Sequence, residues 1–133
     1  MNRSTKHRIL LFMVLAALAV SSGTATAASV KDMVKVLQRT EKTVFLAVQA
    51  GDQNELRRIH ATYQPQLDAL LGSGASFECK MAGNAMQGLL VSLSMTHSAR
   101  KLSALDHDAR QWTTNMGACE RELRLPSKRY LHP

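Results

Sequence analysis

The chain contains few cysteine, proline and aromatic residues, and it lacks several known catalytic motifs. Its 133 residues include two cysteines, three prolines and one tryptophan. The sequence has no C-x-x-C pair, which argues against a redox-active dithiol, and no C-x-x-C-H, which excludes covalent haem attachment. G-x-S-x-G and H-E-x-x-H are also missing. These absences favour a non-enzymatic protein, and we expect no cofactor.

The N-terminus resembles a secretory signal peptide. Arg3, Lys6 and Arg8 precede twelve consecutive apolar residues, 9–20, and a small-residue segment follows them. This order is typical of an export signal, and the apolar run is shorter than the ~20 residues of a membrane-spanning helix. Ala25-Thr26-Ala27 predicts cleavage before Ala28. We therefore expect a periplasmic or secreted product that keeps no stable membrane anchor.

Cleavage would remove much of the positive charge. The full chain has 17 Lys and Arg against 10 Asp and Glu, and residues 1–27 hold three of the basic residues and no acid. The 106 residues that remain carry a formal charge of +4. Because their basic side chains are scattered rather than gathered on one face, nucleic-acid binding is not indicated.

The remaining sequence predicts one small all-α domain, residues 28–125, followed by an exposed tail, residues 126–133. No internal repeat, low-complexity tract or proline-rich linker divides it. Apolar residues recur every three or four positions, which favours amphipathic helices. Ser29, Asp52, Ser76 and Ser103 are the expected helix caps, and Gly51 and the Gly72–Gly74 segment the main breaks. We expect an antiparallel four-helix bundle whose second helix is kinked or split near Thr62 by Pro65.

The two cysteines are predicted to form a disulfide. Cys79 and Cys119 lie twenty residues to either side of Ala99, which falls in the expected turn between the third and fourth helices. An antiparallel hairpin would bring the two cysteines to the same height, as a disulfide requires. Export to an oxidising compartment would allow the bond to form.

The third and first helices contain residues of unusual type at apolar positions. Small residues in the third helix predict close packing by another helix, although a groove for a partner is an alternative; they are Ala82, Gly83, Ala85 and Gly88. In the first helix, Glu41 falls within the apolar stripe. It either pairs with an arginine, from Arg39 or another helix, or lies at the boundary and reaches water.

Two segments are candidate partner-binding surfaces. One is the tail, where Lys128, Arg129, Tyr130 and Leu131 could dock on an acidic protein, although a frayed terminus would look the same. The other surrounds the start of the second helix and comprises Asp52, Glu55, Arg57 and Arg58. Those charges could instead serve the helix dipole.

The leading hypothesis is an exported protein that binds another protein, as an immunity protein, an inhibitor or a stress chaperone would. It comes from architecture and compartment and not from a motif. The alternative is a periplasmic bundle that binds a small ligand, a metal or haem. Its candidate metal ligands are His97, Asp106, His107 and Asp108, and Met33 with a histidine of the fourth helix is the candidate haem pair.

Overall fold

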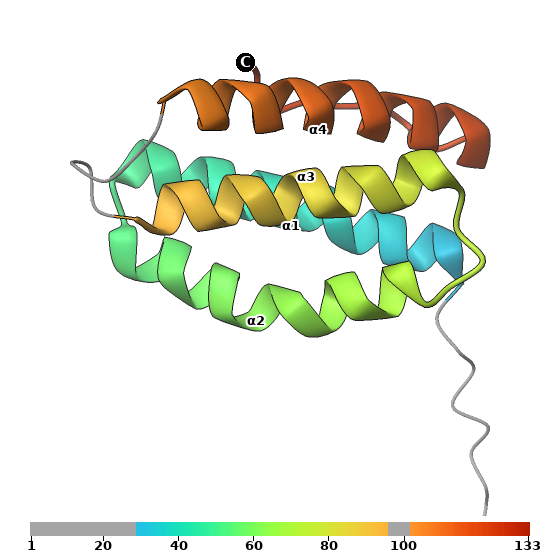
Figure 1. Cartoon of the computed structure of the whole chain (residues 1–133), viewed down its shortest axis with the longest axis horizontal. Helices are drawn as coiled ribbons and strands as arrows, with labels where there is room; N and C mark the ends of the chain where they lie inside the picture. Colours follow the sequence, from blue (N-terminus) through green and yellow to red (C-terminus); the bar gives the residue numbers. More distant parts are fainter. Residues whose placement is uncertain (1–28, 96–101) are drawn as a thin grey trace, which may run out of the picture.

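The computed structural model describes residues 29–95 and 102–133, which form a bundle of four α-helices (Figure 1). The helices are α1 (Val30–Ala50), α2 (Gln53–Leu71), α3 (Phe77–Ser94) and α4 (Leu102–Leu123). The expected signal peptide lies outside the described residues, as does most of the turn before α4. The predicted fold class is confirmed.

Local capping explains where the first three helices begin. The side chains of Ser29, Asp52 and Ser76 accept hydrogen bonds from the backbone N–H groups three residues later, at 3.1, 2.9 and 3.3 Å. Each bond satisfies a donor that the first helical turn leaves without a partner. α1 ends at Gly51, whose φ of 63° lies in the left-handed region that glycine adopts without steric cost.

The second helix is not split at Pro65. α2 is one helix from Gln53 to Leu71, and Figure 1 shows it as a bowed ribbon. Pro65 lacks the N–H that would reach back one turn, so it costs a hydrogen bond, but packing of Tyr63 and Leu67 in the core holds the helix together. Of the two expected outcomes, the split is therefore wrong, and the curvature of α2 agrees with the other, a kink.

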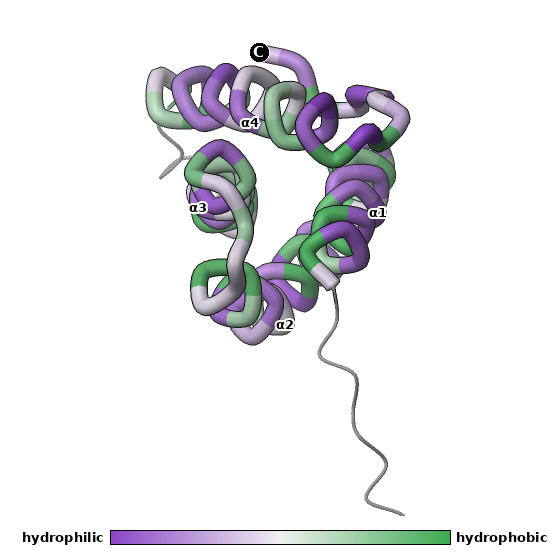
Figure 2. The backbone as a smooth tube through the Cα atoms, turned by 90° about the vertical axis from the view of Figure 1, so that its right-hand side faces the viewer, coloured by the Kyte–Doolittle hydropathy of each residue, from purple (hydrophilic) through white to green (hydrophobic). Residues whose placement is uncertain are grey.

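The helices enclose one hydrophobic core. Figure 2 views the bundle from its end, with α1 and α4 on neighbouring sides. α3 packs most extensively on α4 and then on α2, whereas α1 packs mainly on α2. The largest fully buried side chains include Trp112, Tyr63, Met86 and Met116.

Several large apolar side chains face solvent instead of the core; they are Leu46, Val48, Leu71, Phe77, Met95 and Leu102. Phe77 is 71% exposed and Leu102 is 76% exposed. They are the first residues of α3 and α4. Apolar periodicity predicts the helices, but it does not show which positions the neighbouring helices cover.

The predicted disulfide is present. Cys79 of α3 and Cys119 of α4 are bonded, with their Cα atoms 4.8 Å apart. Both residues are fully buried, and their helices form the most extensive contact in the bundle. A buried disulfide indicates an oxidising, extracytoplasmic compartment. None of the described helices has both the length and the apolar character needed to cross a bilayer.

Candidate functional site

The most unusual feature of the structure is a buried cluster of three charges, Glu41, Glu120 and Arg129, which we call the charge cluster. Glu41 comes from α1 and Glu120 from α4, and both are fully buried. Arg129 comes from the tail, and its side chain is 10% exposed. Its Nη2 lies 3.5 Å from Glu41 Oε2 and also contacts Glu120 Oε1. One cation therefore faces two buried carboxylates.

Burial dominates the electrostatics of this cluster. It raises the pKa of Glu120 above its ordinary value of 4.5, and the nearby Arg129 opposes that rise. The guanidinium of Arg129 also lies over the ring of Trp112, 5.3 Å from its centroid, in a cation–π contact. Because desolvating charges is expensive, the cluster depends on Arg129 staying in place.

The backbone of the tail completes the cluster. Glu41 Oε1 accepts hydrogen bonds from the backbone N–H groups of Tyr130 and Leu131, at 3.0 and 3.1 Å. On α1, the side chain of Gln38 donates to the carbonyl of Pro126 at 2.9 Å. These contacts join segments almost ninety positions apart in the sequence.

Aromatic and aliphatic packing adds to these polar contacts. The ring of Tyr130 lies 5.6 Å from that of Phe45, and Leu131 packs against the core. After α4 the chain turns back and runs beside it, next to α1 (Figure 2). We call the seat of the tail the α1–α4 slot; its walls are Gln38, Glu41 and Phe45 of α1 and Trp112 and Glu120 of α4.

The expectation of an exposed tail needs correction. Arg129, Tyr130 and Leu131 are partly buried, whereas Lys128 and His132 are exposed. Arg129 therefore belongs to the interior and does not present its charge to a partner. The partner of Glu41 is also an arginine of the tail, and not Arg39 or an arginine of another helix.

The sequence did contain one signal for this arrangement. Glu41 interrupts an apolar stripe and Glu120 follows the buried Cys119, so two acids occupy inward positions. Buried carboxylates require a cation or several hydrogen-bond donors. No local sequence pattern indicated that the tail supplies both the cation and the hydrogen-bond donors.

Four cations line a groove beside the tail. Its lining residues contain no acid, and its volume is about 380 Å³. We call it the basic groove; it is lined by Lys35, Gln38, Arg39, Lys42, Leu125, Pro126, Lys128 and Tyr130. The ammonium of Lys128 lies over the ring of Tyr130, 5.0 Å from its centroid. Of the predicted tail residues, Lys128 and Tyr130 thus contribute to an accessible surface.

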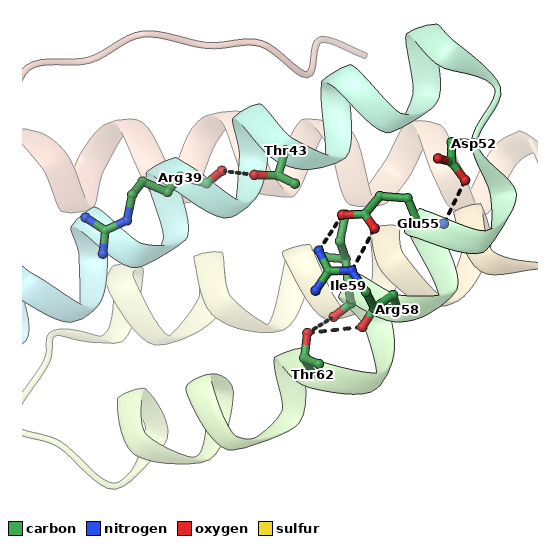
Figure 3. Close-up of polar contacts among 7 residues, drawn as sticks. All are labelled: Arg39, Thr43, Asp52, Glu55, Arg58, Ile59 and Thr62. Atoms are coloured by element: carbon green, nitrogen blue, oxygen red, sulfur yellow. Dashed lines mark hydrogen bonds and ion pairs between the residues drawn. The ribbon is translucent and has the colours of Figure 1, made fainter.

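The second predicted surface is organised by local contacts within α2 (Figure 3). Asp52 caps the helix, and Glu55 forms an ion pair with Arg58 one turn away. That contact with Arg58 lowers the pKa of Glu55. Arg57 is exposed and reaches Asn54 Oδ1 at 3.4 Å. These four charges remain at the surface, and the capping and pairing roles account for three of them.

A second groove runs between α1 and α2 and shares Lys35 and Arg39 with the basic groove. One part, of about 420 Å³, is lined by apolar residues that include Met33, Val36 and Ala69, with Lys35 and Arg39 among its polar residues. A smaller part, of about 240 Å³, continues past Arg39 and Gln66 to Thr43 and Thr62. Figure 3 shows Arg39 and Thr43 on α1 and Thr62 on the neighbouring α2.

The candidate metal ligands are not gathered into a site in the described part of the chain. His97 lies outside the described residues. Asp106 pairs with Arg110 at 2.9 Å, His107 is exposed, and the carboxylate of Asp108 packs against Gly88. Across residues 29–95 and 102–133, no three His, Cys, Asp or Glu side chains are placed to hold a metal ion together.

No protein-family model, curated protein sequence or solved structure matches this chain at a significant level. Function must therefore be inferred from the charge cluster, the tail and the grooves themselves.

Proposed function

We propose that this is an exported, periplasmic, non-enzymatic protein that acts by binding another protein, as an immunity protein, an inhibitor or a stress chaperone does. The signal-like N-terminus and the buried disulfide support export. The basic groove supports protein binding, and it is the observation on which the proposal depends.

The chemistry of the basic groove favours an acidic partner segment. Lys35, Arg39 and Lys42 project from successive turns of α1, and Lys128 faces them from the tail. Complementary charge would speed association and select against basic partners. Gln38 and Tyr130 add hydrogen-bonding and aromatic surface. While the tail is docked, the contacts of the charge cluster keep Lys128 opposite the three cations of α1.

The proposal is tested by reversing the charge of the groove. The mature protein is immobilised and exposed to the exported protein fraction of its source organism. We expect a partner to be retained by the wild type and to lose about tenfold or more of its retention on Lys35→Glu/Lys42→Glu, with weaker binding at high salt.

The matched control is Lys31→Glu/Lys80→Glu, which changes net charge equally at positions outside the groove. It should retain the partner as the wild type does. One stoichiometric partner would identify an inhibitor or immunity protein, and many unfolded clients would identify a chaperone. Equal retention by both double variants, or no retained protein at all, would contradict the proposal.

A further inference from the structure

The tail is seated in the α1–α4 slot as a peptide ligand is seated in a receptor. The backbones of α1 and α4 do not pack closely on each other as the other neighbouring helices do. The tail lies between them and has no regular secondary structure. It contacts both helices through one buried arginine, two backbone amides and two apolar side chains.

Each contact selects a particular chemical feature of the bound segment. Glu41 and Glu120, both fully buried, select one guanidinium, whose planar donors match carboxylates better than an ammonium does. Glu41 Oε1 also accepts hydrogen bonds from the two backbone amides that follow the arginine. These bonds require the segment to run in one direction along the slot. Phe45 selects an aromatic residue directly after the arginine.

The connection to α4 constrains how the tail sits. Arg124 joins the tail to α4 with φ at 54°, a left-handed conformation that is unfavourable for a residue with a Cβ. Within the described chain, Nε and Nη1 of the buried Arg129 have no hydrogen-bond partner. One oxygen of each carboxylate, Glu41 Oε2 and Glu120 Oε2, is also without a hydrogen bond within the described chain. The attached tail therefore leaves donors and acceptors of the slot unused.

We propose that the α1–α4 slot is a binding site for an arginine-containing segment of another protein, and that the chain's own tail is the intramolecular ligand which such a segment displaces. The partner segment carries an arginine followed by an aromatic and an aliphatic residue. This inference goes beyond the basic groove, which suits an acidic segment, and it does not depend on that groove binding anything.

The test supplies the tail as a separate peptide. In the full chain, Arg129→Ala removes the buried cation and weakens docking of the chain's own tail, while the exposed Lys128→Ala leaves Arg129 in place. The peptide PSKRYLHP and its counterpart PSKAYLHP are titrated against both proteins at neutral pH. Isothermal titration calorimetry measures the affinity of each peptide. Fluorescence of Trp112, the only tryptophan, reports the arrival of a guanidinium over its ring.

We expect PSKRYLHP to bind Arg129→Ala at least about tenfold more tightly than Lys128→Ala, because the attached tail competes at an effective concentration in the millimolar range. PSKAYLHP should bind Arg129→Ala at least about tenfold more weakly than PSKRYLHP, because it brings no cation to the two carboxylates. Equal affinity for the two peptides, or for the two proteins, would overturn the proposal.

A second measurement applies if Arg129→Ala does not fold. Excess PSKRYLHP added to the wild type should accelerate hydrogen exchange at the backbone amides of Tyr130 and Leu131, which lose Glu41 when the tail is displaced. Unchanged exchange would overturn the proposal. Lys35→Glu/Lys42→Glu should still bind PSKRYLHP in the slot, because neither lysine is one of its walls. Loss of partner binding at the basic groove and loss of peptide binding at the slot are therefore distinguishable.

Discussion

Arg129 connects three parts of the molecule. It is the only described cation in contact with both Glu41 and Glu120, and it lies over Trp112. A buried ion pair contributes little net free energy, because the desolvation of its charges offsets their attraction. Removing one member is different, since it strands the remaining charges and costs about 3–5 kcal/mol. Arg129 is therefore a structural residue even though it lies in the tail that follows α4.

Glu120 should make stability depend on pH. Because its pKa is raised above 4.5 in the native protein, the native state binds more protons than the unfolded state from that pH up to the raised value. The contribution of Glu120 to stability therefore falls as pH increases through this window. Urea unfolding from pH 4 to pH 8 measures this effect. As pH rises through the window, the unfolding free energy of the wild type should fall relative to that of Glu120→Gln.

Glu122→Gln provides the control for this measurement, because Glu122 is exposed on the same helix. The change in pH dependence should be larger for Glu120→Gln than for Glu122→Gln. If the curve of Glu120→Gln were parallel to that of the wild type, Glu120 would have the same pKa in the native and unfolded states.

At the level of the helices, α3 shows why small residues occur in the bundle. Gly83 is buried, and its carbonyl accepts a hydrogen bond from the hydroxyl of Tyr63 at 2.8 Å. A Cβ added at Gly83 would lie 2.8 Å from Leu70 Cδ2 and 3.0 Å from Leu67 Cδ1. The close packing expected from the sequence is therefore confirmed at this position, and the neighbour is α2.

Gly83→Ala should destabilise the protein. Alanine would favour the helix by about 1 kcal/mol, but overlap with two buried leucines costs more, and we expect a net loss of about 1–2 kcal/mol. Denaturant unfolding measures it. In Gly117→Ala the nearest atom to the new Cβ is Arg121 Nη1 at 3.5 Å, so this control should gain about 0.5–1 kcal/mol. A stabilised Gly83→Ala would show that α2 and α3 can move apart.

For the molecule as a whole, the disulfide closes a large loop. Cys79 and Cys119 are 40 positions apart, and they join the two helices that pack most extensively. In the chain-entropy model a loop of this size stabilises by about 4 kcal/mol. A domain of about one hundred residues has about 5–15 kcal/mol in total, so this bond provides a large share of its stability.

Cys79→Ala/Cys119→Ala should therefore lower the free energy of unfolding by about 4 kcal/mol. Thermal and urea unfolding of the double variant and the oxidised wild type measure the difference. Reduction of the wild type under unfolding conditions provides a control without a change of sequence and should give a similar loss. Equal melting temperatures for the variant and the oxidised wild type would contradict this role.

Local sequence determined the features that depend on neighbouring residues. The caps at Ser29, Asp52 and Ser76 satisfy backbone groups within three residues, so they mark helix starts without knowledge of the fold. The disulfide could also be predicted, because two antiparallel helices joined by a turn place residues at equal distances from that turn side by side.

Only the tertiary structure decided where the tail lies and what Glu41 contacts. Tyr130 and Glu41 are 89 positions apart, and no periodic pattern links them. A short terminal segment rich in basic residues has the composition of an exposed tail, and it becomes an interior element only when two helices from opposite ends of the chain bury carboxylates on either side of it. The desolvation of those carboxylates makes Arg129 part of the interior, and it arises only after the helices have packed.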